Sequence, residues 1–138
     1  MTGIVVVSHS YPLAKAAVDL AREMVGENPP RIEIAAGLSE TTLGTDATAI
    51  QTAIEAAADD QGVVVLMDLG SAIMSAETAR ELLDPELADT VRLSWAPLVE
   101  GLVGAVVVAS TGADREAVAA EAETGIEAKQ THLNNTSS

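Results

Sequence analysis

The sequence predicts a small α/β domain with a doubly wound, open and mainly parallel sheet. Short β-branched runs alternate with amphipathic stretches along the chain, which is the pattern of strand–helix–strand units. The runs are continuously apolar, so we expect strands that are buried on both faces and joined by right-handed helical crossovers. With 138 residues and 48% hydrophobic content, the chain is long enough for one domain around one core.

Two strand–helix units are predicted in the first half of the chain. The first strand covers residues 4–7, and an amphipathic helix follows over 13–25 after a loop that contains Pro12. The break at 26–30 contains two prolines and separates this helix from the second strand at 31–35. A polar loop then leads into the second helix.

The second helix, over 46–58, precedes two further strands. A run of Val, Leu and Met at 62–67 predicts the third strand, which ends at Asp68. A helix over 72–83 follows and stops before an Asp-Pro pair, and the fourth strand is predicted at 90–93. Strands and helices therefore alternate throughout this half.

The segment 98–110 admits two interpretations. Pro97 suits the first turn of a helix, whereas three consecutive valines suit a strand, and we expect a helix. Its apolar circumference indicates either packing in the core or, in so small a domain, the interface of a homodimer. Ala and Glu residues predict a last helix over 114–128, and residues 130–138 resemble a frayed polar tail.

Composition excludes several classes of protein. Seven Lys and Arg residues against 21 Asp and Glu residues give a net charge of −14, which disfavours nucleic acid and membrane surfaces as partners. The absence of Cys excludes disulfides, thiolate nucleophiles and Cys-ligated metals. No basic segment precedes an apolar one at the start of the chain, and no apolar run approaches the ~20 residues of a membrane helix, so we expect a cytoplasmic protein.

His9 and Asp68 are the strongest candidates for a functional site. They follow the first and third predicted strands, whose carboxyl ends flank the point where strand order reverses and ligands commonly bind. An imidazole beside a helix N-terminus can attack phosphorus, with Asp68 accepting the other ring N–H and fixing the tautomer. The alternatives are a histidine that only packs or caps and an aspartate that caps the next helix. The position of His9 favours a function.

Weaker signals surround this pair. Ser10, Gly70, Ser71 and Thr45 stand in loops that lead into helices, where exposed backbone N–H groups could hold phosphoryl oxygens. The same residue types are common at helix starts for capping alone.

The sequence lacks the motifs of several other activities. It contains neither a P-loop nor a G-x-G-x-x-G fingerprint, and it has no G-x-S-x-G elbow of a serine hydrolase. No carboxylate pair follows the first strand to hold Mg²⁺, as a domain phosphorylated on Asp68 would need. We expect no metal and no cofactor.

Six sequence blocks occur in order along the chain: Val7-Ser8-His9-Ser10, Ile34-Ala35-Ala36-Gly37, Gly44-Thr45-Asp46, Met67-Asp68-Leu69-Gly70-Ser71-Ala72, Ser75-Ala76-Glu77-Thr78-Ala79 and Ala96-Pro97-Leu98-Val99-Glu100-Gly101. Together they resemble the DhaM family, the phosphotransferase subunits of phosphoenolpyruvate-dependent dihydroxyacetone kinases. The first domain of this family is similar to the mannose-type IIA domain of the sugar phosphotransferase system (PTS). The resemblance implies a IIA-like phosphocarrier domain at 1–133, and the polar residues that end the chain predict a disordered tail at 134–138.

The resemblance also implies a phosphotransferase with a phosphohistidine intermediate. His9 matches the histidine that accepts a phosphoryl group from phospho-HPr and passes it to ADP on the DhaL subunit, while DhaK binds dihydroxyacetone; Asp68 matches the assisting aspartate. Family members are homodimers, and some continue into fused HPr-like and Enzyme I-like domains, so a chain without these depends on separate donor proteins. Two alternatives remain: a mannose-type sugar IIA domain that passes phosphate to a IIB protein, and a regulatory module that binds partners according to their phosphorylation.

Overall fold

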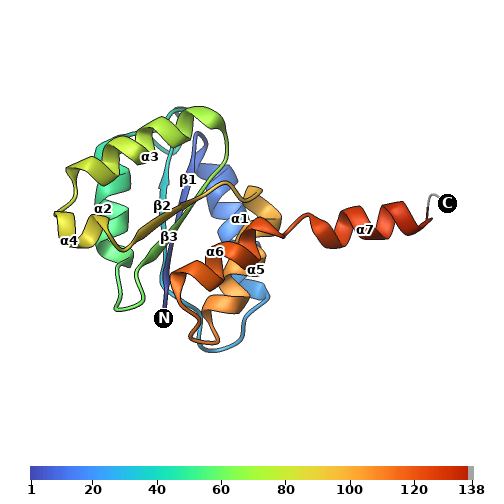
Figure 1. The fold of residues 1–138 in the computed structure, drawn as a ribbon. Coiled ribbons are helices and arrows are strands. Elements are labelled where there is room, and N and C mark those ends of the chain that lie inside the picture. Colours follow the sequence, from blue (N-terminus) through green and yellow to red (C-terminus); the bar gives the residue numbers. More distant parts are fainter. Residues whose placement is uncertain (137–138) are drawn as a thin grey trace.

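The computed structural model describes residues 1–136 and confirms the predicted fold class. Four parallel strands form one sheet in the order β2-β1-β3-β4, with helices on both faces (Figure 1). The strands are β1 (Gly3–Ser8), β2 (Ile32–Ala36), β3 (Val63–Met67) and β4 (Val91–Ser94).

The helices form two layers around this sheet. Their bounds are α1 (Tyr11–Glu23), α2 (Ala47–Ala57), α3 (Gly70–Leu82), α4 (Pro85–Ala88), α5 (Leu98–Ala109), α6 (Arg115–Glu123) and α7 (Glu127–Thr136). Helices α1, α5 and α6 cover one face of the sheet, and α2 and α3 cover the other (Figure 1). Helix α7 projects away from both layers.

The two central strands, β1 and β3, explain the continuously apolar runs of the sequence. Every residue of both strands is buried. Successive side chains enter opposite layers: Ile4 and Val6 pack under α1, α5 and α6, while Val5 and Val7 pack under α2 and α3. The helices contribute mostly Ala to these layers, which lets them lie close to the sheet.

Polar side chains fix where the helices begin. The Ser10 hydroxyl accepts the Leu13 N–H at the start of α1, and Asp46 and Asp114 cap α2 and α6 in the same way. Ser10 and Asp46 end the loops that leave the carboxyl edge of the sheet after β1 and β2, and Asp114 ends the loop between α5 and α6. Local sequence therefore determines where these helices enter the fold.

Helix α5 settles the interpretation of the segment after Pro97. It is a helix as predicted, and it packs on the sheet between α1 and α6, with Leu102, Ala105 and Val106 fully buried. Most of its apolar circumference is thus covered within one chain, because α6 folds back onto the side that the sheet does not reach. The homodimer consequently receives no support from this helix and stays a prediction.

The C-terminal region differs from the predicted helix over 114–128 and frayed tail over 130–138. Helix α6 ends at Glu123, and the chain beyond it passes close to the backbone of Glu100, where a Cβ added at Gly125 would stand 3.0 Å from the carbonyl carbon. Helix α7 then continues to residue 136, since it starts with strong helix formers and Lys129 pairs with Glu100 at 2.6 Å. The tail predicted at 134–138 therefore begins inside a helix, and 137–138 lie outside the described residues.

Two smaller observations complete the fold. The four-residue helix α4, absent from the sequence prediction, begins at the Asp-Pro pair where the preceding helix was expected to stop. Among residues 1–136, no helix combines the length and the apolar character that crossing a membrane requires.

Candidate functional site

The candidate site lies at the carboxyl edge of the sheet, between β1 and β3. The chain passes from β1 to β2 on one side and then returns to β3 on the other, so strand order reverses at this point. His9 directly follows β1 and Asp68 directly follows β3. The Asp68 N–H donates to the Val7 carbonyl at 3.1 Å and extends the strand pairing by one step, which brings the two side chains together.

The carboxylate of Asp68 is held by four donors. Its Oδ1 contacts Nδ1 of His9 at 2.9 Å and accepts the Leu69 N–H at 2.7 Å. Its Oδ2 accepts the His9 backbone N–H at 2.9 Å and the Ser8 hydroxyl at 3.0 Å. The side chain is only 9% exposed, so few waters compete with these bonds.

These contacts determine the charge of Asp68. Burial by itself raises the pKa of the carboxyl, but the hydrogen bonds from His9, Ser8 and Leu69 together outweigh burial and leave the pKa below its usual value. Asp68 is therefore an anion at neutral pH, able only to accept hydrogen bonds. The proton between it and His9 must then reside on Nδ1 of the imidazole.

The second ring nitrogen of His9, Nε2, is left without the proton. With the proton on Nδ1, the neutral ring has its free electron pair on Nε2, which lies 2.6 Å from the Ser71 hydroxyl at the start of α3. The imidazole is 25% exposed, so one edge stays open to solvent while the other is anchored. A nucleophilic histidine would need this arrangement, with Nε2 unprotonated and the ring held in place.

The loop residues named from the sequence have different surroundings. Ser71 contacts His9, and the N-terminus of α3 at Gly70 is open, with nothing within 4 Å of an added Cβ. Ser10 instead caps α1. The Thr45 hydroxyl bonds Ser75 of α3 at 2.7 Å, and among the described residues no bond joins it to His9. Of these four residues, only Ser71 is hydrogen-bonded to the imidazole.

Ser8 is the contact that sequence reasoning missed. It is fully buried at the end of an otherwise apolar strand, and its hydroxyl contacts Asp68. A buried polar residue beside a candidate histidine could have given the signal, because buried hydroxyls are nearly always hydrogen-bonded.

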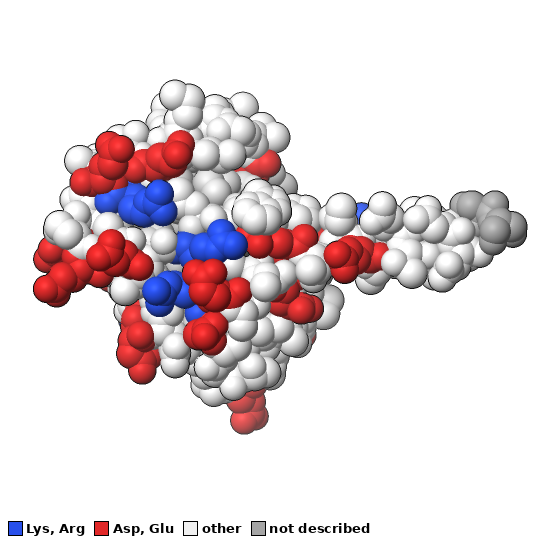
Figure 2. All heavy atoms as spheres, in the orientation of Figure 1, with Lys and Arg blue, Asp and Glu red and all other residues white. Residues whose placement is uncertain are grey.

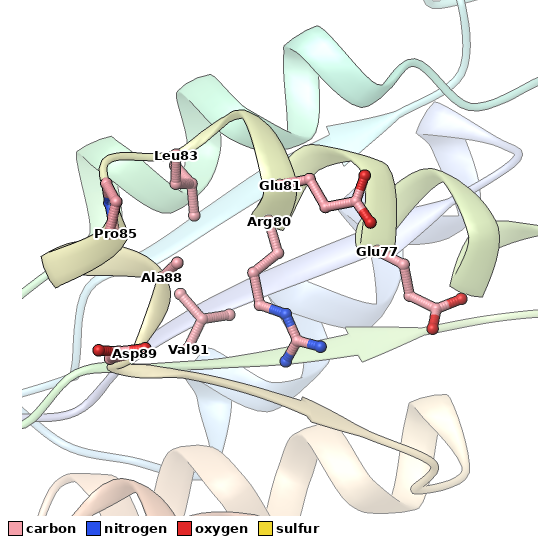
Figure 3. Close-up of a pocket in the computed structure, with 8 residues that line it drawn as sticks. All are labelled: Glu77, Arg80, Glu81, Leu83, Pro85, Ala88, Asp89 and Val91. Atoms are coloured by element: carbon pink, nitrogen blue, oxygen red, sulfur yellow. The ribbon is translucent and has the colours of Figure 1, made fainter.

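A groove of about 260 Å³ adjoins the site. It runs between the loop of Asp68, Leu69 and Gly70 and the loop that carries Trp95, so any molecule approaching Asp68 from this side meets that exposed indole. A larger pocket of about 580 Å³ lies between α3 and α4, where Figure 3 shows Arg80 extending toward the strands. Neither His9 nor Asp68 lines this larger pocket, so it is not part of the site.

Two further features of the domain are its charge and its potential metal ligands. Figure 2 shows acidic side chains over much of the face in view, with a small group of Lys and Arg residues among them. The charge of −14 repels polyanions. Within residues 1–136, no group of three potential metal ligands occurs.

Comparison with protein families identifies the class of this domain. Residues 3–119 match EIIA-man, described as the PTS system fructose IIA component. Because this match covers most of the chain, the chain belongs to the EIIA-man family of PTS domains.

Individual relatives have more specific names than the family as a whole. The phosphoryl donor subunit DhaM of the PEP-dependent dihydroxyacetone kinase of Escherichia coli (strain K12) is 47% identical over 135 residues, which are 96% of this chain and 29% of that protein. DhaM of Providencia stuartii is 44% identical over 99% of this chain and 29% of that protein. DhaM of dihydroxyacetone kinase 2 of Listeria innocua is 38% identical over 88% of this chain and 96% of its own length. These matches confirm the resemblance to DhaM subunits that the sequence blocks predicted.

A solved structure supports the fold. The crystal structure of the unknown function protein EF1359 superposes with a TM-score of 0.75 at 30% identity, covering 89% of this chain and 93% of that one. The chain spans about 29% of the length of the first two DhaM relatives.

Proposed function

We propose that this domain is a phosphohistidine carrier that supplies a dihydroxyacetone kinase with phosphoryl groups. The observation that carries the proposal is the alignment of Asp68, His9 and Ser71: a buried anion holds Nδ1, and Nε2 lies at the open edge beside a hydroxyl and a helix N-terminus. Membership of the EIIA-man family and the similarity to DhaM subunits support the same function.

The transfer step follows from this geometry. The electron pair of Nε2 attacks the phosphorus of a phosphohistidine on the donor, a P–N bond to His9 forms, and the P–N bond to the donor breaks, returning its electron pair to the donor imidazole. Asp68 accepts the Nδ1–H bond throughout and stabilises the positive charge that develops on the ring. The Ser71 hydroxyl, freed from Nε2, turns to donate to a phosphoryl oxygen, assisted by N–H groups at the start of α3.

The onward step uses the same bond. An oxygen of the β-phosphate of ADP attacks the phosphorus, the P–N bond breaks, and its electrons return to Nε2, so that ATP forms and His9 is regenerated. A phosphoramidate retains the transfer potential for this step, whereas an ester on Ser8, Ser10 or Ser71 would trap the group.

The partners are part of the proposal. We assign phospho-HPr as the donor, ADP on a DhaL subunit as the acceptor, and DhaK as the subunit that binds dihydroxyacetone, all in the cytoplasm. The relatives' names, which specify a PEP-dependent dihydroxyacetone kinase, support this assignment over a sugar IIA domain. We also propose that the domain works as a homodimer.

The proposal is tested by reconstitution. The chain is incubated with phosphoenolpyruvate, Enzyme I and HPr, and the label is located by mass spectrometry; DhaL with ADP, DhaK and dihydroxyacetone are then added. We expect a label on His9, on Nε2, that is lost in acid and survives alkali, and formation of dihydroxyacetone phosphate. His9→Ala should abolish both. An acid-stable label or one that persists in His9→Ala would refute the mechanism, and transfer to a sugar IIB protein but not to DhaL would refute the acceptor.

A further inference from the structure

The hydroxyl of Ser8 joins the backbone of the loop before α1 to the carboxylate of Asp68. Ser8 is the last residue of β1 and is fully buried. Its Oγ accepts the Ser10 N–H at 3.0 Å and lies 3.0 Å from Asp68 Oδ2 and 3.1 Å from the Ser10 carbonyl oxygen.

The single hydroxyl proton has two possible acceptors, and the surroundings decide between them. Each acceptor already takes one backbone N–H: the Ser10 carbonyl accepts that of Ala14 at 3.1 Å, and Asp68 Oδ2 accepts that of His9 at 2.9 Å, so charge decides between them. The Asp68 carboxylate is charged, and hydrogen bonds to charged acceptors are about twice as strong as those between neutral groups. The Ser8 proton therefore points to Asp68.

The two oxygens of Asp68 then accept hydrogen bonds from different donors. Oδ1 accepts Nδ1–H of His9, while Oδ2 accepts the Ser8 hydroxyl and the His9 backbone N–H. The bonds to Oδ2 fix the rotation of the carboxylate plane, and this rotation determines whether Oδ1 points at the imidazole. Without the hydroxyl, one backbone N–H alone would hold Oδ2 in a site from which water is largely excluded.

We propose that Ser8 is a positioning residue for phosphoryl transfer: its hydroxyl fixes the Asp68 carboxylate and thereby keeps the proton of His9 on Nδ1. This inference rests on the function proposed above. Ser8 is fully buried and is not hydrogen-bonded to the His9 ring, so we expect its effect on labelling to pass through Asp68 rather than through its bond to the Ser10 N–H. Removing a hydrogen bond to a charged group typically costs a factor of about 10 to 100, and we expect a loss of that size in the rate of labelling.

A double-mutant cycle tests this route. The rate of labelling by phospho-HPr is measured for the wild-type chain, Ser8→Ala, Asp68→Asn and the double variant. Ser8→Ala should label about 10 to 100 times more slowly than wild type, yet slow the Asp68→Asn chain by less than about threefold, because the carboxylate through which it acts is gone. Equal losses in both backgrounds, or a wild-type rate for Ser8→Ala, would overturn the proposal.

A matched variant separates positioning from stability. The Thr2 hydroxyl is also fully buried, directly before the opposite end of β1, and it donates to the Ala113 carbonyl at 2.8 Å. Thr2→Val should lower the free energy of unfolding without changing the labelling rate, while thermal melting shows whether Ser8→Ala remains folded. A rate loss in Thr2→Val equal to that in Ser8→Ala would assign the effect to the strand and refute a specific role for Ser8.

The titration of Asp68 gives a readout that does not depend on transfer. His9 is the one titratable side chain that bonds this carboxyl in the described part of the chain. Because the Ser8 hydroxyl stabilises the anion, Ser8→Ala should raise the pKa of Asp68, and Ser8→Thr should restore it. The pKa is measured from the ¹³C chemical shift of the Asp68 carboxyl as a function of pH. An unchanged pKa refutes the inference even if His9 is labelled normally, whereas failure of the wild-type chain to label on His9 refutes the proposed function instead.

Discussion

Replacing Asp68 by Asn tests how much of the site's reactivity depends on the charge of one carboxylate. The substitution keeps the size of the side chain but turns one oxygen into an NH₂ group. In the structure both oxygens face donors only: Nδ1 of His9 and the Leu69 N–H on one side, the Ser8 hydroxyl and the His9 N–H on the other. In either orientation of the amide, its NH₂ group therefore confronts two donors.

The magnitude follows from these contacts. If the NH₂ group faces Nδ1, it donates to that nitrogen and moves the proton to Nε2, which removes the nucleophile; if it faces Ser8, the developing imidazolium loses its anionic partner. Loss of the anionic partner of the imidazolium alone corresponds to about 1.5–3 kcal/mol, or a factor of roughly 10 to 150 in the labelling rate. The wrong tautomer adds to this, up to the factor of about 10⁴ known for a triad aspartate. We expect labelling to slow by about 10² to 10³, because Ser71 and the start of α3 still hold the phosphoryl oxygens.

The assay is rapid-quench labelling with phospho-HPr in excess, compared with Asp114→Asn as the control. Asp114 also accepts a backbone N–H, at the start of α6, but it is not bonded to His9. The control should label at the wild-type rate. If Asp68→Asn labels within threefold of wild type, the tautomer argument is wrong.

Three further predictions concern His132, the pH dependence of stability and the oligomeric state. His132→Ala should leave labelling unchanged, because this residue lies exposed on the projecting helix α7. A large loss in the labelling assay would show that the site has been assigned to the wrong place. The pKa of Asp68 is lower in the folded chain than in the unfolded chain, where it is about 3.9, so the ionised carboxylate stabilises the fold above that pH. This stabilisation is lost as the pH falls from the unfolded pKa through the folded pKa. Urea unfolding of Asp68→Asn should thus show a smaller loss of stability between pH 5 and pH 3 than wild type, and an equal loss would contradict the assignment. Light scattering at micromolar concentration should give the mass of a dimer, and a monomer mass would remove the homodimer proposal.

The order of strands and helices could be predicted from the sequence because it depends on local patterns of apolar and polar residues. Continuous apolar runs predicted buried strands, and the residues that follow them, His9 and Asp68, were placed at one edge by the rule that parallel strands end together. The C-terminal boundary was not accessible in this way. At the division between α6 and α7, Gly125 lies against Glu100, a contact between residues far apart in the sequence that local patterns do not report.

The sequence by itself determined the fold class, the pairing of His9 with Asp68 and, through its motif blocks, the family. Only the tertiary structure decided which nitrogen of His9 lacks the proton, that Ser71 contacts this nitrogen while Ser10 caps α1, and that Ser8 holds the carboxylate. The physical reason is that periodicity reports which face of an element is buried. The direction of a hydrogen bond between strands depends instead on register and side-chain rotation, which are fixed only when β1 and β3 pair in the folded sheet.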